Sequence, residues 1–438
     1  MQILKMEKIV INGGKPLFGE IEISGMKNSA VAVIMGSLLV EDECTIENLP
    51  DISDVSTAFE ILGRMGASVK RINKTTYRVD NTRSAGGTSP SELVRKMRAS
   101  YYLLGAELGR FHKANVDQPG GDYLGERPID QHIKGFEALG ATFEINKSTG
   151  FYNASAPNGL KGAHIFMDVA TVGGTINIIL AAVKAEGTTV IENAAREPHV
   201  VDLAIFLNKC GAKISGMGTN VIKIKGVDKL YGCTYTILPD MIEAGTYMAI
   251  AAATGGRLRI KNAIPKHLES ISAKLMEMGA NVEEEDDSVV VSRIGDMNKA
   301  NIKTQVYPGM PTDMNAQMGV LLCLAKSGTS YITEEVSDNR FRYCEELRRM
   351  GAVIKVSGRV AAIEGTGRLN PAVVKAVDIR GGVAMVIAAL AADGRTEIED
   401  IDHIERGYED IVSKLKNVGA DIKKISGGPE PFRYEKAN

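Results

Sequence analysis

The segment Leu62-Gly63-Arg64-Met65-Gly66-Ala67 ends a helix-like stretch with a Gly-Ala pair that recurs along the chain. Glycine is the usual residue just after a helix, because it adopts the left-handed conformation without steric cost. Each pair is followed by a strand-like run such as Val282–Glu285. The pairs stand roughly 70 residues apart at nearly constant intervals, and such self-similarity indicates structural repeats. They are Gly66-Ala67, Gly140-Ala141, Gly211-Ala212, Gly279-Ala280, Gly351-Ala352 and Gly419-Ala420.

Two further elements precede each pair. The nearer one is a short β-branched strand that ends in an Asn or acidic turn, as in Thr189–Asn193. The farther one is a helix rich in Ala and Gly, which is apolar nearly all round and should therefore be buried. The predicted buried helices are Ser29–Leu39, Ala99–Leu108, Gly173–Ala185, Ala244–Ala253, Ala316–Ala325 and Gly382–Ala391.

These elements predict a repeated unit of strand, buried helix, strand, surface helix, strand and strand. Six such units make an α/β protein, which we expect to have two lobes with three units in each. The pattern alone does not fix that grouping. One long α/β domain with chance Gly-Ala pairs is the alternative, and the shared flanking elements argue against it.

Composition excludes several classes of protein. The chain has 438 residues, enough for two or three domains, and is 44% hydrophobic and 24% charged, as in ordinary globular proteins. Its 52 basic and 54 acidic residues give a net charge of -2, so we expect no nucleic-acid partner. Apolar runs such as Ile176–Val183 are too short to cross a bilayer, and Met1–Gly14 lacks a signal-peptide core. These features predict a cytoplasmic protein without membrane insertion.

The cysteines and histidines show no metal-binding spacing. Five cysteines stand without a C-x-x-C pair, and six histidines are scattered. The sequence therefore predicts idle thiols in a reducing compartment, with no disulfide, no metal and no cofactor.

Polar residues stand at the start of the six buried helices. A charge there is costly unless it faces a cleft or a ligand, and helix N-termini favour phosphate and carboxylate oxygens. The cations Lys27, Arg98 and Arg380 indicate an anionic substrate. Asp240 fits either a helix cap or the substrate site. A Gly- and Pro-rich loop at Gln118–Pro128 fits either a lid or an ordinary surface loop. The six residues are Lys27, Arg98, Thr171, Asp240, Asp313 and Arg380.

From Ile9 to about Ile425 the sequence resembles the UDP-N-acetylglucosamine 1-carboxyvinyltransferase family. The resemblance implies an inverse α/β barrel-like fold with lobes at 25–232 and at 1–24 plus 233–438. It rests on Ser24–Asn28, Lys96–Ser100, Gly120-Gly121 with Arg127–Asp130, Glu192–Pro198, Pro311–Met314, Asp338–Phe341 and His403–Tyr408.

The resemblance also implies an activity and a site. The enzyme would transfer the carboxyvinyl group of phosphoenolpyruvate to the 3-hydroxyl of UDP-N-acetylglucosamine and release phosphate, as a monomer, in peptidoglycan precursor synthesis. Catalytic roles are implied for Asp122, Asp313, Lys27 and Arg406, with Asp313 as the base. The implied substrate-binding residues are Lys27, Asn28, Arg98, Arg127, Pro128, Ile129, Asp130, Gln131, Thr171, Val172, Gly173, Asp313, Val336, Arg340, Arg380 and Arg406.

The sequence departs from the family pattern at three positions. Asp122 replaces the usual cysteine that fosfomycin-type epoxides alkylate, Val169 replaces a frequent lysine, and His199 replaces an acidic residue. These departures motivate one alternative, a sugar-nucleotide-binding paralogue without turnover. The other alternative is the sister transferase that acts on shikimate 3-phosphate. It is disfavoured because no arginine follows Lys27-Asn28 within a few residues.

Overall fold

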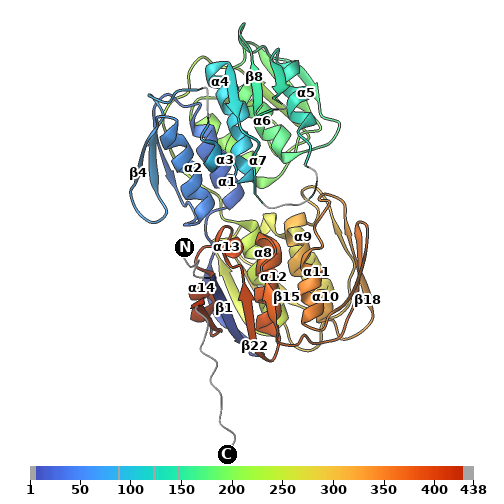
Figure 1. The fold of residues 1–438 in the computed structure, drawn as a ribbon. Coiled ribbons are helices and arrows are strands. Elements are labelled where there is room, and N and C mark those ends of the chain that lie inside the picture. The colour runs from blue at the N-terminus through green and yellow to red at the C-terminus, as the bar shows by residue number, and fades with distance from the viewer. Residues whose placement is uncertain (1–5, 87–88, 122–124, 126, 147, 428–438) are drawn as a thin grey trace, which may run out of the picture.

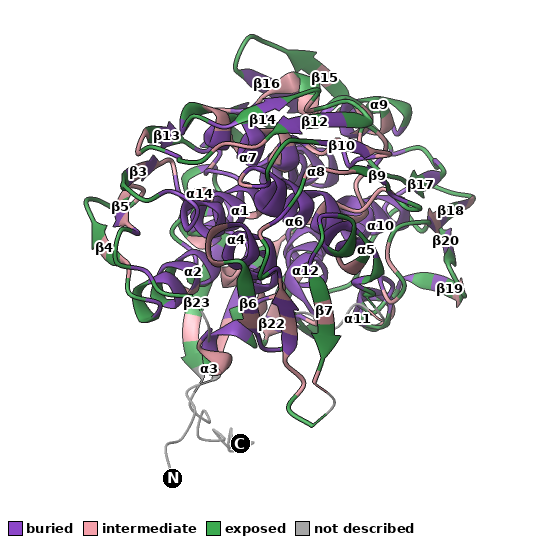
Figure 2. Ribbon diagram, turned by 90° about the horizontal axis from the view of Figure 1, so that it is seen from above, coloured by how far each residue is buried: buried purple, intermediate pink, exposed green. Residues whose placement is uncertain are grey.

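The computed structural model describes residues 6–86, 89–121, 125, 127–146 and 148–427. The chain forms two mixed α/β lobes stacked one above the other (Figure 1). In each lobe, strands lie at the outside and buried helices at the centre, as the view from above shows (Figure 2). The two-lobed α/β prediction is confirmed.

The first lobe holds three sheets, with strand orders β13-β3-β5-β4, β6-β8-β7 and β11-β12-β10-β9. Their strands are β3 (Glu43–Glu47), β4 (Ser68–Arg71), β5 (Tyr77–Asp80), β6 (Lys113–Val116), β7 (Thr142–Ile145), β8 (Tyr152–Ser155), β9 (His164–Phe166), β10 (Thr188–Glu192), β11 (Lys213–Ser215), β12 (Val221–Lys225) and β13 (Thr234–Thr236).

The second lobe also holds three sheets, with strand orders β21-β22-β1-β23, β15-β16-β14-β2 and β17-β18-β20-β19. Their strands are β1 (Met6–Gly13), β2 (Phe18–Glu22), β14 (Arg257–Lys261), β15 (Asn281–Glu284), β16 (Ser288–Ser292), β17 (Ile302–Thr304), β18 (Thr329–Glu334), β19 (Val353–Ser357), β20 (Val360–Glu364), β21 (Val373–Lys375), β22 (Gly394–Glu399) and β23 (Asp421–Gly427).

The four-stranded sheets share one pairing pattern. In each, one inner strand pairs in parallel with an edge strand and antiparallel with its other neighbour; β10, for example, pairs in parallel with β9 and antiparallel with β12. The same holds for the strands around β3, β14, β18 and β22. This shared pattern supports the hypothesis of a repeated unit.

Each predicted buried helix overlaps a helix of the structure, and most residues of these helices are fully buried. Small side chains let them pack closely: a Cβ at Gly105 would lie 2.4 Å from the Asn177 carbonyl oxygen. The buried helices are α1 (Lys27–Ser37), α4 (Tyr102–Phe111), α6 (Val172–Ala182), α8 (Met241–Thr254), α10 (Asn315–Cys323) and α12 (Ile379–Ala391).

The remaining helices lie outside the buried helices, and two of the short 3₁₀ turns lead directly into α4 and α10. They are α2 (Ser53–Arg64), α3 (Ser91–Val94), α5 (Asp130–Ala138), α7 (Pro198–Lys209), α9 (Glu269–Glu277), α11 (Tyr343–Arg349), α13 (Asp402–Glu405) and α14 (Ile411–Asn417), with short 3₁₀ turns η1 (Arg98–Tyr101), η2 (Pro265–His267) and η3 (Thr312–Met314). Within the described residues, no helix is both long enough and apolar enough to cross a bilayer.

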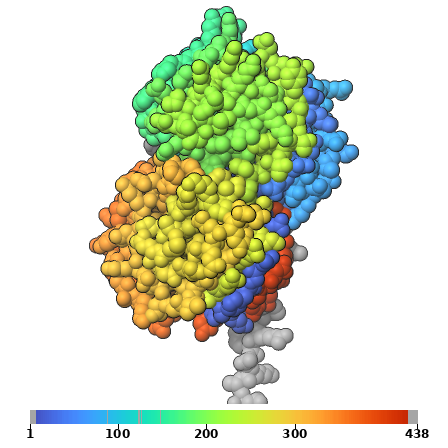
Figure 3. All heavy atoms as spheres, turned by 180° about the vertical axis from the view of Figure 1, so that it is seen from behind, coloured from blue at the N-terminus to red at the C-terminus, as the bar shows by residue number. Residues whose placement is uncertain are grey.

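The chain crosses between the lobes twice, and the crossings exchange strands. β2 leads into α1 of the first lobe but pairs with β14 of the second, whereas β13 leads into α8 of the second lobe but pairs with β3 of the first. The two crossing segments lie side by side, since Met26 N donates to Leu238 O at 2.6 Å. Strand pairing thus puts the return crossing after β13, a few residues beyond the boundary expected at residue 232. The N-terminal strands lie against the C-terminal part of the chain (Figure 3).

Candidate active site

Residues at the starts of α1, α8, α10 and α12 meet between the lobes, because these buried helices direct their N-termini toward the other lobe. The Asp240 side chain caps α8, with Oδ1 accepting from Ile242 N at 2.8 Å. Its other oxygen, Oδ2, accepts from Lys27 N at 3.1 Å. Asp240 is therefore a helix cap that also holds the start of α1 in the opposite lobe.

Asp313 lies in η3 and is held by two arginines. Arg380 Nη2 donates to Asp313 Oδ2 at 2.8 Å, and Arg340 Nη2 donates to Oδ1. Burial would raise the pKa of the Asp313 carboxyl, but the charges of Arg380 and Arg340 outweigh it and hold that pKa below its ordinary value. Asp313 is thus an ionised acceptor. The same two arginines are fork-shaped donors for an incoming carboxylate.

Arg380 is itself fixed on its other side. Its Nη1 donates to the Tyr408 hydroxyl at 3.0 Å, and its guanidinium lies 5.5 Å from the centre of the Tyr408 ring. Burial would lower the pKa of Arg380, but the Asp313 charge raises it above the ordinary value. A buried, permanent cation whose geometry is fixed on two sides suits a bound anion.

A second carboxylate joins cations of the two lobes. Asp54, in the first turn of α2, pairs through Oδ2 with Lys27 Nζ at 2.8 Å. Its Oδ1 pairs with Arg406 Nε of the second lobe at 3.1 Å. Burial lowers the pKa of Lys27, as do the charges of Arg380 and Arg406, whereas Asp54 raises it. Ammonium and guanidinium groups also bind phosphate oxygens, so this pair of cations suits a phosphate.

The first lobe supplies the residues expected to bind the nucleotide. Arg98 is half-buried; its Nη2 donates to the Arg127 carbonyl at 2.7 Å and its guanidinium stacks 5.2 Å from the Tyr101 ring centre. A Cβ at Gly173 would lie 2.3 Å from the Tyr101 hydroxyl and 2.8 Å from His132 Nε2, so a larger residue there would displace these side chains. Thr171 caps α6 by accepting from Gly174 N at 3.2 Å.

The next residues form a polar patch on the same side. Gln131 is buried and exchanges hydrogen bonds with Asp168, whose Oδ1 also pairs with Lys134 at 2.8 Å. Val169 follows Asp168 directly and is 60% exposed. Its side chain is apolar, so unlike a lysine at this position it offers no charge to a diphosphate. The other expected binding residues here are Pro128 and Asp130, which are exposed, Ile129, which is buried, and Val172, which is half-buried.

The remaining expected residues have mixed placements. Asn28 is half-buried in the first turn of α1. Val336 is 45% exposed, and its backbone N–H donates to the Glu334 side chain at 2.9 Å. Glu334 also accepts a hydrogen bond from Thr312 of η3. Asp122 lies outside the described residues. In the same loop Gly125 reaches the second lobe, where a Cβ on it would lie 2.9 Å from Asp338 Cβ.

His199, the third departure, lies in the first turn of α7 facing the other lobe. Burial lowers its pKa, while the negative charges of Glu197, Asp313 and Asp240 oppose that shift. Asp313 belongs to the second lobe, so His199 sits within electrostatic reach of the catalytic candidate.

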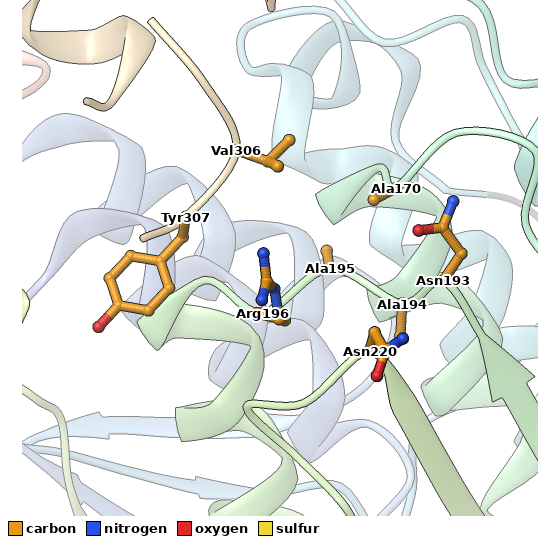
Figure 4. Close-up of a pocket in the computed structure, with 8 residues that line it drawn as sticks. All are labelled: Ala170, Asn193, Ala194, Ala195, Arg196, Asn220, Val306 and Tyr307. Carbon is orange, nitrogen blue, oxygen red and sulfur yellow. The ribbon is translucent and has the colours of Figure 1, made fainter. Parts of the chain in front are cut away.

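Two cavities open between the lobes. The first, about 400 Å³, places Arg196 between Tyr307 of the second lobe and Asn193, Ala194 and Asn220 of the first (Figure 4). The second, about 490 Å³, is lined by Asp51, Ile52, Ser53, Asp402, Glu405, Arg406, Tyr408 and Asp410.

The structure brings Lys27, Asp313, Arg340, Arg380 and Arg406 together, and it adds residues that the sequence did not single out. Asp54 and Tyr408 hold these cations, and Arg196 lines the first cavity. No local pattern marks Asp54, since its partner Arg406 stands 352 residues away. Tyr408 could have been noted, because it closes the motif His403–Tyr408.

Comparison with known proteins identifies the family to which this fold and site belong. The model of the EPSP synthase (3-phosphoshikimate 1-carboxyvinyltransferase) family matches residues 11–415. The enolpyruvyl transferase NikO from Streptomyces tendae superposes with a TM-score of 0.87 at 25% identity, covering 97% of this chain and 100% of that one. An EPSP synthase from Acinetobacter baumannii shares the fold, with a TM-score of 0.74 at 18% identity over 96% and 100% of the two chains. Fold and site together define an enolpyruvyl transferase.

Two sequence relatives narrow the class. UDP-N-acetylglucosamine 1-carboxyvinyltransferase 3 of Caldanaerobacter subterraneus is 57% identical over 96% of this chain and 100% of its own length. UDP-N-acetylglucosamine 1-carboxyvinyltransferase of Clostridium botulinum is 53% identical over the same shares. The chain belongs to the UDP-N-acetylglucosamine 1-carboxyvinyltransferase family.

Proposed function

We propose that this protein transfers the carboxyvinyl group of phosphoenolpyruvate to the 3-hydroxyl of UDP-N-acetylglucosamine and releases inorganic phosphate, a step in peptidoglycan precursor synthesis. The observation that carries the proposal is Asp313, a carboxylate of the second lobe held between Arg340 and Arg380. It combines a base for a hydroxyl with guanidinium groups for a carboxylate. The activity named for the relatives is the same transfer.

The reaction proceeds by addition and elimination. A proton adds to C3 of the enol, the sugar oxygen forms a bond to C2, and Asp313 accepts the hydroxyl proton. The C2–O bond to phosphate then breaks as a proton leaves C3, so the double bond is restored. Lys27 and Arg406 stabilise the phosphate, with Arg127 at the edge of the site. Asp122 is the proposed donor of the C3 proton.

Side-chain cations supply the positive charge that stabilises the departing phosphate in the transition state. Lys27 and Arg406 already share one carboxylate, Asp54, so the arriving phosphate can take over part of its hydrogen bonds. Arg98, Gln131 and Gly173 form the proposed nucleotide side of the site. Asn28 and Val336 border the sugar.

The test measures phosphate release from phosphoenolpyruvate with and without UDP-N-acetylglucosamine. We expect release only with the sugar nucleotide, together with a product heavier by the carboxyvinyl group. Release that depends on shikimate 3-phosphate instead would identify the sister transferase. Binding of the sugar nucleotide without release would identify the paralogue without turnover. The monomeric state and cytoplasmic location remain predictions, and light scattering on the purified protein tests the first.

A further inference from the structure

Three of the five cysteines converge in the first lobe, although the sequence gave them no recognisable spacing. Cys44 lies in β3, Cys210 directly follows α7, and Cys233 directly precedes β13. Their sulfur atoms all lie within 4.8 Å of one another. Among the described residues, no other trio of histidine, cysteine or acidic side chains is this compact.

Backbone hydrogen bonds hold the three segments in place. Thr45 N, next to Cys44, donates to the Cys233 carbonyl at 2.9 Å, and Tyr231 N donates to the Cys210 carbonyl at 2.8 Å. β13 also pairs in parallel with β3, with Thr234 opposite Thr45. The backbone positions of the three cysteines therefore follow from the fold.

The sulfur spacing fits one metal ion. A zinc–thiolate bond of about 2.3 Å puts sulfur atoms about 3.8–4.0 Å apart around a tetrahedral or trigonal ion. The observed separations include 3.4 Å between Cys210 Sγ and Cys233 Sγ and reach at most 4.8 Å. Seating an ion would change these separations by up to about 1 Å, which is within the reach of side-chain rotation.

The chemistry of the three groups agrees with ion binding. Cys44 and Cys210 are fully buried, and Cys233 is half-buried, so the cluster opens to solvent on one side. Sulfur is the ligand type that a soft cation prefers.

We propose that Cys44, Cys210 and Cys233 form a three-thiolate site for one soft, thiophilic metal ion, of the zinc(II) or copper(I) class. Each thiol gives its proton to solvent as its sulfur binds, so three thiolates and a divalent ion carry a net charge of -1. A zinc ion completes its shell with water on the Cys233 side, whereas copper(I) is satisfied by three sulfurs. The ion ties β3 and α7 to the strand that leads into the second lobe.

The experiment uses the full-length protein, reduced and handled without air. Zinc(II), copper(I) and cadmium(II) are titrated separately, with a chromophoric chelator as competitor and the ultraviolet thiolate-to-cadmium band as a count of sulfur ligands. We expect one equivalent bound, a three-sulfur cadmium band and a higher melting temperature. Whether zinc or copper survives competition best identifies the ion class.

Matched serine variants separate the site from folding. Cys233→Ser, at the half-buried position, should lower affinity by at least about 10–100-fold, the loss expected even for outer-sphere partners. Cys323→Ser changes a fully buried cysteine outside the cluster and should bind like wild type. Equal binding by wild type and Cys233→Ser overturns the proposal, as does the absence of one tight equivalent. A Cys210–Cys233 disulfide in protein kept from air also overturns it.

Discussion

At the scale of single residues, the proposed role of Asp313 as a base conflicts with its ion pairs in the free protein. Its ion pairs with Arg340 and Arg380 lower the pKa of the carboxyl, which keeps it deprotonated but weakens it as a base. An anionic substrate that binds the same guanidinium groups would draw them away and raise that pKa. Substrate binding would therefore strengthen the base just when it is needed.

Asp313→Asn tests this role. Asparagine keeps the size of the side chain but cannot accept the hydroxyl proton, so turnover should fall by roughly a hundred- to ten-thousand-fold. Calorimetry should find the affinity for UDP-N-acetylglucosamine changed far less. Asp296→Asn, at an exposed pair with Lys326, serves as control and should keep full activity. Turnover within a few-fold of wild type would leave Asp313 with a structural role only.

Lys27 should set the alkaline limit of activity. Burial, Arg380 and Arg406 lower the pKa of its ammonium, and only the protonated form attracts phosphate. Because the charge is present below that pKa and lost above it, kcat/KM for phosphoenolpyruvate should fall as pH rises, earlier than for an exposed lysine. In Lys27→Arg the guanidinium stays charged, so any remaining activity should extend to higher pH. Identical alkaline limits in both proteins would exclude Lys27 as the titrating group.

Asp122 should make the enzyme insensitive to fosfomycin-type epoxides, because a carboxylate attacks carbon far more weakly than a thiolate does. Asp122→Cys should restore inactivation, with one adduct found by mass spectrometry on the new cysteine. The variant should also keep activity toward the thiol pKa of about 8.5. An adduct on Asp122 of the wild-type protein, with matching loss of activity, would contradict this prediction.

At the scale of elements, the sequence predicted the buried helices well. Runs such as Ala244–Ala253 are apolar on all faces, and the structure buries the corresponding residues of α8. The strand partners were harder, since β2 and β13 each pair in the lobe opposite to the helix they precede. Periodicity reports which face of a strand is buried but carries no information about its distant partner.

Capping of α8 gives a prediction at the same scale. Asp240→Ala removes the acceptor for Ile242 N and Glu243 N, and such losses cost about 0.5–2 kcal/mol. The free energy of unfolding, measured in denaturant, should drop by that amount. Asp240→Asn retains a side-chain oxygen and should recover most of it. If alanine and asparagine behave alike, the cap contributes little.

At the scale of the whole molecule, ion pairs hold the two lobes together around the site. Asp54 of the first lobe meets Arg406 of the second at 3.1 Å, and Lys74 meets Glu409 at 2.6 Å. A backbone contact from Tyr307 N to Glu197 Oε1, at 3.3 Å, adds a third link. The sequence singled out candidate cations for the site but not these partners, because each link joins segments more than a hundred residues apart.

Asp54→Asn should destabilise the protein in a way that an anion reverses. The change leaves Lys27 and Arg406 without their shared carboxylate, and removing one partner of a buried pair costs about 3 kcal/mol. Inorganic phosphate should bind in its place and raise the melting temperature of the variant more than that of wild type. Glu43→Gln, at an exposed pair with Arg78, should show neither effect. Equal phosphate shifts in all three proteins would refute the proposed sharing of charge.

The pairing of β1 with β22 and β23 has a consequence for biosynthesis. Lys8 of β1 pairs with Glu397, 389 residues later, and translation at about 5–20 residues per second separates the two by roughly 20–80 seconds. Through that interval the first lobe can fold on the ribosome, while β1 waits with both edges unpaired. Open strand edges invite aggregation, so the edges of β1 are exposed to non-native pairing until β22 and β23 have been made.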